Sequence, residues 1–263
     1  MKNNGLIITA IIVLSIVVFL LVMFLVMCLT GRISFRGGIM FGLGSKSTNV
    51  IYDNQFELEK VSNIEIREDA GDVIIKETSD DNIKVVLYGD DSNDAKVDLN
   101  NGKLNVDNTH KKTKLFGGRK NEIIIYIPSN YSNEIKVKNN YGNCEITDLE
   151  NSTLNINCDA GDVEVGKIKN ATIKCNYGNI EVKEILNKCE IKADCGNIKI
   201  DRISIQENSS IKANLGNVDI NSTNDIYIEA DVDLGKTNIA NNNRNSNITL
   251  KIKCDCGNIT IND

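Results

Sequence analysis

Hydrophobic and polar residues alternate along most of this chain, and a glycine-centred turn interrupts the alternation at regular intervals. From residue 137 onward the turn reads Asp/Asn-x-Gly-Asn/Asp/Lys, and its glycines recur every 17 to 22 residues. Strict alternation is typical of half-buried β-strands, with one face inward and the other in water. A fixed period of about 20 residues predicts a solenoid or a regular array of hairpins. The turn glycines are Gly71, Gly142, Gly161, Gly178, Gly196, Gly216, Gly235 and Gly257.

Alignment on the glycine shows which positions face inward. The positions two and four residues after it, and five residues before it, are nearly all aliphatic, with polar residues between them. Each column keeps its character from repeat to repeat, as expected when coils stack directly above one another with strands about 4.8 Å apart. We therefore predict an all-β, β-helix-like solenoid with coils of 17 to 22 residues. An up-and-down meander with the same turn is the alternative.

The turn itself has a predictable chemistry. Glycine marks a corner where the backbone needs a positive φ angle, which glycine adopts at no steric cost. The Asp or Asn two residues before it can close an Asx-turn onto the following backbone. Rows of Asp and Asn along one edge could also hold calcium, but the calcium-binding G-G-x-G-x-D repeat is missing, so no metal is expected. The aspartates concerned are Asp159, Asp194, Asp233 and Asp255.

The pattern divides the chain into five segments. A short tail, residues 1–5, precedes an uncharged apolar run at residues 6–29, and a glycine-rich linker follows at residues 30–50. Residues 51–136 alternate less regularly and are predicted to cap the stack, because solenoids need atypical end repeats. Residues 137–263 carry the regular repeats.

The apolar run at residues 6–29 predicts a single transmembrane helix. Its 24 residues reach about 36 Å at 1.5 Å per residue, enough to cross a bilayer with some tilt. A cleaved signal peptide has a shorter apolar core and a small-residue cleavage site, which this run lacks. Lipidation of Cys28 is disfavoured because Met27 stands where a small residue is needed.

Charge excludes nucleic acid as an expected partner. The net charge is −6, and basic and acidic residues are mixed throughout. The only dense basic run is Lys111, Lys112, Lys114, Arg119 and Lys120, which we interpret as a solvated hairpin loop rather than a ligand or lipid-headgroup patch.

Residues 56–263 resemble the bacterial putative adhesin family, a domain-of-unknown-function family with β-strand repeats. The likeness rests on NIEIREDAGDVIIK at residues 63–76, on IIIYIPSN at residues 123–130, and on the repeated Gly-Asn/Asp-Ile/Val-x-Ile/Val units. The resemblance implies a right-handed, membrane-tethered β-solenoid with a surface role. It also favours an extracellular β-domain. The positive-inside rule alone, with Arg32, Arg36 and Lys46 after the helix, would favour the cytoplasm.

Seven cysteines of the β-domain fall in columns that the alignment assigns to the interior. A free buried cysteine behaves as a small hydrophobe, so we expect packing rather than chemistry. The alternative is a disulfide between Cys158 and Cys175, one coil apart in one column, where Cα atoms about 4.8 Å apart are in range. The absence of C-x₂-C spacing disfavours zinc. The seven are Cys144, Cys158, Cys175, Cys189, Cys195, Cys254 and Cys256.

Catalysis is not expected, and neither is a cofactor. His110 is the only histidine and lies in the polar basic loop, so no Ser-His-Asp or Cys-His set is available. The leading hypothesis is an envelope protein whose solenoid binds a partner protein or a cell-wall or surface polymer. The alternatives are a regulator that senses the envelope and acts on a membrane signalling partner, and a polysaccharide-active enzyme with a carboxylate pair.

The C-terminal coil ends almost at its last inward residue, Ile261, with no capping segment after it. An uncapped coil leaves strand edges available. We therefore expect the chain's end to fold over itself or two stacks to associate end to end through this coil.

Overall fold

A computed structural model of the chain describes residues 49–89, 95–109 and 121–262. The chain divides into two units, Met1–Gly42 and Leu43–Asp263, and every described residue belongs to the second. All described strands and contacts therefore lie in this second unit.

Several sequence predictions lie outside the described residues. They are the transmembrane helix at residues 6–29, nearly all of the glycine-rich linker, and His110 with the basic run after it. Within the described ranges, no helix is long and apolar enough to cross a membrane.

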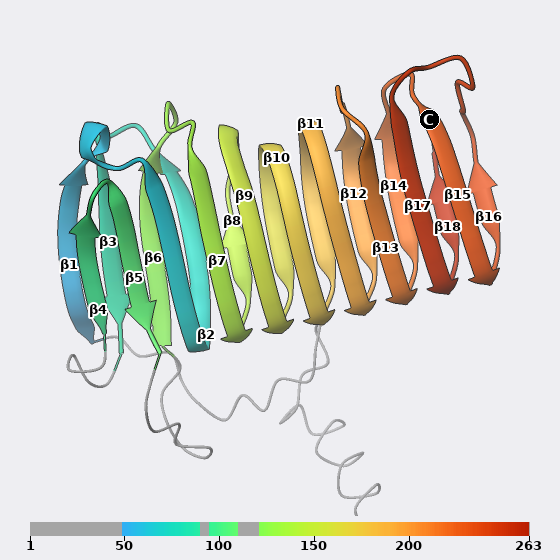
Figure 1. Cartoon of the computed structure of the whole chain (residues 1–263). Coiled ribbons are helices and arrows are strands. Elements are labelled where there is room, and N and C mark those ends of the chain that lie inside the picture. Colours follow the sequence, from blue (N-terminus) through green and yellow to red (C-terminus); the bar gives the residue numbers. More distant parts are fainter. Residues whose placement is uncertain (1–48, 90–94, 110–120, 263) are drawn as a thin grey trace, which may run out of the picture. The chain divides into compact units, whose positions relative to one another are not determined.

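The described chain is built almost entirely of β-strands, with one short 3₁₀ helix, η1 (Leu58–Lys60) (Figure 1). Strand formation follows from the alternation of β-branched and polar residues. The strands are β1 (Val50–Glu57), β2 (Asn63–Thr78), β3 (Asn82–Tyr88), β4 (Lys96–Asn100), β5 (Lys103–Asn108), β6 (Asn121–Pro128), β7 (Glu134–Tyr141), β8 (Cys144–Ile146), β9 (Leu149–Ala160), β10 (Val163–Tyr177), β11 (Ile180–Cys195), β12 (Ile198–Ile203), β13 (Ser209–Leu215), β14 (Val218–Thr223), β15 (Tyr227–Leu234), β16 (Thr237–Ile239), β17 (Thr249–Cys256) and β18 (Ile259–Ile261).

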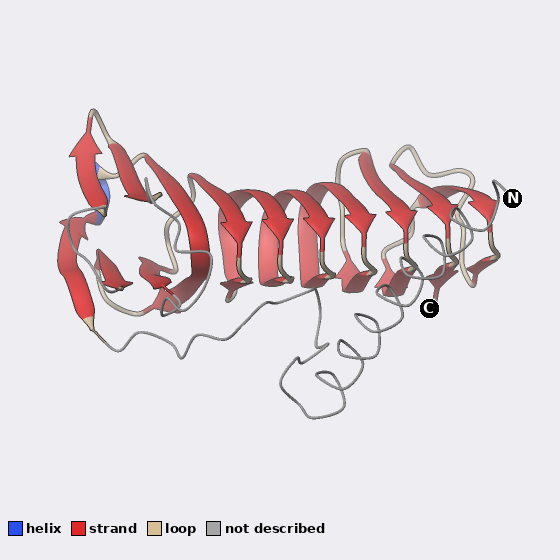
Figure 2. Ribbon diagram, turned by 90° about the horizontal axis from the view of Figure 1, so that it is seen from below, coloured by secondary structure: helices blue, strands red, loops and turns tan. Residues whose placement is uncertain are grey.

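The regular coils form layers of parallel strands (Figure 2). The glycine corner separates the strands of two layers, as where β9 ends at Ala160 and β10 begins at Val163. Before the corner, the strands pair in the order β2–β7–β9–β10–β11–β13–β17–β15. After it, they pair in the order β2–β8–β10–β11–β12–β14–β18–β16. All of these pairs are parallel, with a register shift between Ile168 and Asn170 where β10 pairs with β9 and β11, so the coils stack as predicted. The meander alternative is wrong, because a meander pairs neighbouring strands antiparallel.

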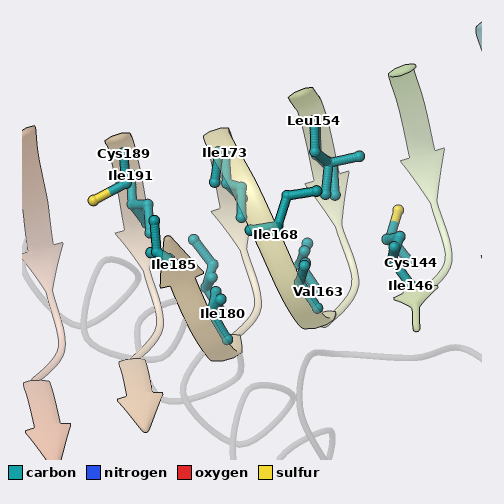
Figure 3. Close-up of a cluster of buried hydrophobic side chains, with 14 of the residues drawn as sticks. Cys144, Ile146, Leu154, Val163, Ile168, Ile173, Ile180, Ile185, Cys189 and Ile191 are labelled. Carbon is teal, nitrogen blue, oxygen red and sulfur yellow. The ribbon is translucent and has the colours of Figure 1, made fainter. Parts of the chain in front are cut away.

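The inward columns form one continuous aliphatic core. Figure 3 shows side chains of successive coils, such as Ile173 and Ile191, lying in line with one another between the strand layers. Each fully buried isoleucine contributes about 1.5–3 kcal/mol relative to an exposed one. In spatial order, the column five residues before the glycine is Ile66, Val137, Ile156, Ile173, Ile191, Ile211, Ile252 and Ala230, and all but Ala230 are at most 2% exposed.

The corner glycines pack directly on one another. Gly161 and Gly178 have φ angles of 146° and 148°, which side-chain-bearing residues rarely adopt. A Cβ atom on Gly178 would lie 2.0 Å from the carbonyl oxygen of Gly161, and one on Gly161 would lie 2.0 Å from that of Gly142. Gly71 differs, because strand β2 runs straight through it without a positive φ angle. The predicted turn is therefore wrong there; Gly71 is needed because a Cβ would lie 2.6 Å from the carbonyl oxygen of Asn121.

The leading half caps one end of the stack. Its strands β5 and β6 pair parallel with β2, and the strands beyond them pair antiparallel. In one layer, β5 lies between β2 and β4. In the other layer, β6 lies between β2 and β3, and β3 also pairs with β1. The β4–β5 hairpin turns at Asn101 and Gly102, with φ angles of 50° and 79°, as the Asn-Gly pair predicts. The register of the regular stack already begins at β2, so strands β3 to β6 are inserted in the sequence between its first two coils.

The last two coils do not stack in sequence order. The C-terminal coil, β17–β18, lies between β13–β14 and β15–β16 and is paired on both sides. The prediction that this coil leaves an open end is therefore wrong, and the coil at the end of the stack is β15–β16. Asn242 covers part of that end, because its side chain accepts from the Ile228 N–H and donates to the Ile228 carbonyl, both at 2.9 Å.

The glycine corner predicts a large effect of a single methyl group. Gly178→Ala should lower the free energy of unfolding by at least about 2 kcal/mol, through strain at the positive φ angle and displacement of the neighbouring coil. Denaturant titration of the full chain in detergent measures this loss. Gly89→Ala is the control, because its Cβ would meet only side-chain atoms, the nearest being Ile51 Cδ1 at 3.0 Å. Equal losses for both variants would contradict the steric argument.

The coil order predicts which exposed residues are neighbours. Ser210 pairs with Lys251, and Glu229 lies beyond Lys251. Under mild oxidation, the double variant Ser210→Cys/Lys251→Cys should form an intrachain disulfide, because the Cα atoms of neighbouring coils are about 4.8 Å apart. Ser210→Cys/Glu229→Cys should not form one. Peptide mass spectrometry distinguishes them, and the reverse result would show coils stacked in sequence order.

Candidate interaction surface

The residues directly after the corner glycines form a ladder of hydrogen bonds that runs from coil to coil. The residue after each glycine donates its backbone N–H to the side-chain oxygen of the equivalent residue one coil away, as in Asp162 to Asn143 at 3.1 Å and Asn179 to Asp162 at 2.8 Å. The ladder ends with Lys236, which donates to Asn258 at 3.0 Å and has no acceptor oxygen to offer. These side chains tie coils together, so their role extends beyond closing a local turn.

The residues two before the glycine form a second ladder. Asn176 donates its amide to Asp159, and Asn214 donates to Asp194, both at 2.9 Å. The predicted Asx-turn interpretation of this row is replaced by contacts between coils. In the described ranges, no group of three or more Asp, Glu, Cys or His side chains is placed to hold a metal ion.

The residues directly before the corner glycines point outward and are apolar. Strict alternation would place them inside, but the chain bends before the glycine, and the glycine takes the inward place. Tyr141, Tyr177, Leu215 and Leu234 are 65%, 63%, 55% and 70% exposed. Among the described residues, only Val50 joins them as a large exposed hydrophobic side chain. Gathering of such side chains in one column marks an interaction surface.

We call this column the corner stripe. Register pairs join its members from coil to coil, and the seven coils from Tyr141 to Leu234 span about 29 Å at 4.8 Å per coil. In spatial order the corner stripe is Ala70, Tyr141, Ala160, Tyr177, Cys195, Leu215, Cys256 and Leu234.

Residues 61–262 decide the family. A family model described as Toastrack DUF4097 matches those residues. The chain belongs to the Toastrack DUF4097 family. The resemblance to putative adhesins with β-strand repeats is thereby confirmed.

The fold of the Toastrack domain is similar to that of a solved structure, and weaker similarities to others accompany it. A protein described as a putative adhesin from Bacteroides fragilis has a TM-score of 0.55 and 16% identity, covering 82% of this chain and 99% of its own. A putative cell adhesion protein from Clostridium sporogenes has 12% identity and a TM-score of 0.37, covering 81% and 99%. A putative lipid binding protein from Parabacteroides distasonis has 12% identity and a TM-score of 0.45, covering 82% and 98%. None of these descriptions names an enzyme. No curated protein matches the chain.

The cysteines of the Toastrack domain separate into two groups. Cys144, Cys158, Cys175, Cys189 and Cys254 are buried, as predicted for core positions. The prediction is wrong for the two cysteines of the corner stripe: Cys195 is half-buried and Cys256 is exposed. Both lie directly before a corner glycine, where the bend turns outward a side chain that strict alternation would place inside.

Three of the buried thiols, those of Cys158, Cys175 and Cys254, face glycine carbonyls at the corner. Cys175 Sγ lies 3.4 Å from the Gly161 carbonyl oxygen, and Cys158 Sγ lies 3.6 Å from the same atom. Both residues are free thiols in adjacent coils, so the structure holds no disulfide between them. A hydrogen bond with the Cys144 thiol, together with burial, raises the pKa of Cys158, and a hydrogen bond with Cys158 raises the pKa of Cys175. Thiols held in this protonated form are poor nucleophiles.

Burial of Cys189 predicts a pH dependence of stability. Desolvation raises its pKa to about 12, so above an unfolded-state pKa of about 8.5 the unfolded chain loses this proton before the folded chain does. The stabilisation is complete below pH 8.5 and is lost as pH rises toward about 12. Thermal melts under reducing conditions should show a falling midpoint from pH 8.5 to 10, with a shallower fall for Cys189→Ala. Identical slopes would contradict the assignment.

Proposed function

We propose that this Toastrack protein is a non-enzymatic, single-pass membrane protein of the bacterial cell envelope. A helix at residues 6–29 anchors it, and its right-handed solenoid lies outside the cell and serves as a surface for adhesion or scaffolding. The length and uniform apolarity of the N-terminal run support the anchor. The description of a solved structure with this fold as a putative adhesin supports the surface role by analogy.

The observation that carries the proposal is the corner stripe. Tyr177 and Leu215 are more than half exposed in an ordered scaffold, where solvation of large apolar side chains gains nothing for folding. Rigid stacking of the coils holds such side chains in line, so little conformational entropy is lost when a partner covers them. The sheet faces differ, because their outward columns carry Lys, Glu and Asp that pair with one another, as in Lys192 with Asp194 at 2.8 Å.

The proposal is tested by photo-cross-linking of the full chain in growing cells. A benzophenone amino acid replacing Leu215 should form adducts on illumination, whereas the same amino acid at Lys199, on an outward sheet position, should form few. Protease added to intact cells before illumination should remove the adducts if the solenoid is outside. Absence of adducts at residue 215, or equal yields at both positions, would overturn the proposed surface.

A further inference from the structure

The corner stripe alternates between small and large side chains along the stack. In spatial order it runs Ala, Tyr, Ala, Tyr, Cys, Leu, Cys, Leu from Ala70 to Leu234. In sequence order the alternation breaks, because Leu234 follows Leu215 and Cys256 comes last. Insertion of the C-terminal coil between the two leucines restores it. The surface therefore has large ridges about 9.6 Å apart, separated by small-residue valleys.

From this alternation we infer that the occupant of the corner stripe is a second copy of this chain, packed antiparallel about a twofold axis across the stripe between Tyr177 and Cys195. The inference rests on the proposed function and names its partner. An isologous contact needs a surface that is complementary to itself. With eight alternating positions, reversal of direction places every large residue of one copy opposite a small residue of the other. The facing pairs are Tyr177 with Cys195, Ala160 with Leu215, Tyr141 with Cys256, and Ala70 with Leu234.

The row of residues two before each glycine pairs carboxylate with amide at the three positions nearest the axis, and places Asp69 opposite Asp233 at its ends. Antiparallel pairing places Asn176 opposite Asp194 and Asp159 opposite Asn214, so a carboxylate meets an amide. Each amide has two N–H hydrogens, and Asn176 and Asn214 use one within their own chains at 2.9 Å. The second N–H of each amide can therefore be donated to the carboxylate that faces it.

The row of residues directly after the corner glycines favours the same antiparallel arrangement. Across the axis, Asn179 faces Asn197, and Asp162 faces Asn217, so amides again lie opposite amides or a carboxylate. A parallel dimer, with its twofold axis along the stripe, would instead stack Tyr177 on Tyr177 and bring Asp162 opposite Asp159, which places large on large and like charge on like charge. The antiparallel pairing is therefore the arrangement that the side chains favour.

Two other occupants fit less well. An anionic lipid surface would meet carboxylates on both sides of the corner stripe, including Asp159 and Asp162, and would be repelled. A linear glycan could stack on Tyr141 and Tyr177, which lie two coils apart, but the other half of the stripe offers it Leu215 and Leu234 instead of aromatic rings. A glycan remains an outcome of the test.

The test is thiol cross-linking of the full chain in membranes of expressing cells. All variants carry Cys28→Ser and Cys195→Ser, which leaves Cys256 as the remaining exposed thiol among the described cysteines. Tyr141→Cys has only alanines beside it in its own stripe, so it has no intrachain partner there. A short bismaleimide should join it to Cys256 of the second copy and give a covalent dimer on a denaturing gel.

Two controls decide the geometry. Adding Cys256→Ser to Tyr141→Cys should abolish the covalent dimer, and the background without Tyr141→Cys should give none. No dimer with Tyr141→Cys, or a dimer that survives Cys256→Ser, overturns the antiparallel inference. If residue 215 photo-cross-links only to a glycan or another protein, the inference fails while the proposed function stands. If residue 215 gives no adduct at all, both fail.

A valley-filling variant tests the contact without new thiols. Ala160→Tyr should raise the dissociation constant of the dimer at least about tenfold, because it blocks the valley that receives Leu215 of the second copy. Thermal stability of the solenoid should not change, since the neighbouring coils already carry tyrosine in this column. Ser210→Tyr, on an outward sheet position, is the control and should leave dimerisation intact. Equal dissociation constants for the two variants would overturn the inference.

Discussion

The structure depends on one contact: each corner glycine lies against the carbonyl oxygen of the glycine one coil away. A Cβ atom added to Gly161 or Gly178 would lie only 2.0 Å from that oxygen. Neighbouring coils can therefore approach to strand-pairing distance at the corner only if no side chain is present there. Strand pairing on both sides of the corner, the side-chain ladder through Asn143 and Asp162, and alignment of the inward columns all follow from that approach.

The same contact explains why equivalent side chains form lines along the surface of the solenoid. Because each coil repeats the last in register, a residue type at one outward position becomes a line along the stack. The corner stripe is such a line, and the bend before the glycine turns it outward. Without this bend, strict alternation would have buried Tyr141, Tyr177, Leu215 and Leu234. Exposure of these side chains is thus a property of the corner, and their alternation with small residues is a property of the coil order.

The fold is largely predictable from the sequence, because both of its signals are local. Period-two alternation defines strands, and glycine spacing defines coil length, so the residues alone assign the inward columns through Ile173 and Ile191. Errors arise at two places where local signals end. Gly71 carries the turn sequence but continues as a strand, because its neighbour Asn121 belongs to the capping half. Cys195 and Cys256 are wrongly assigned to the core when alternation is extended through the bend.

The sequence by itself determined the strand period, the coil length, the core columns and the need for glycine at the corner, since each depends on residues close together in the chain. Only the tertiary structure decided that β17–β18 lies inside the stack and that β15–β16 ends it. Coils with nearly the same inward residues stack almost equally well in either order, so their local patterns do not specify which is outermost. Lys236, which ends the side-chain ladder, fits the outermost position, and the alternation of the corner stripe becomes visible only in that order.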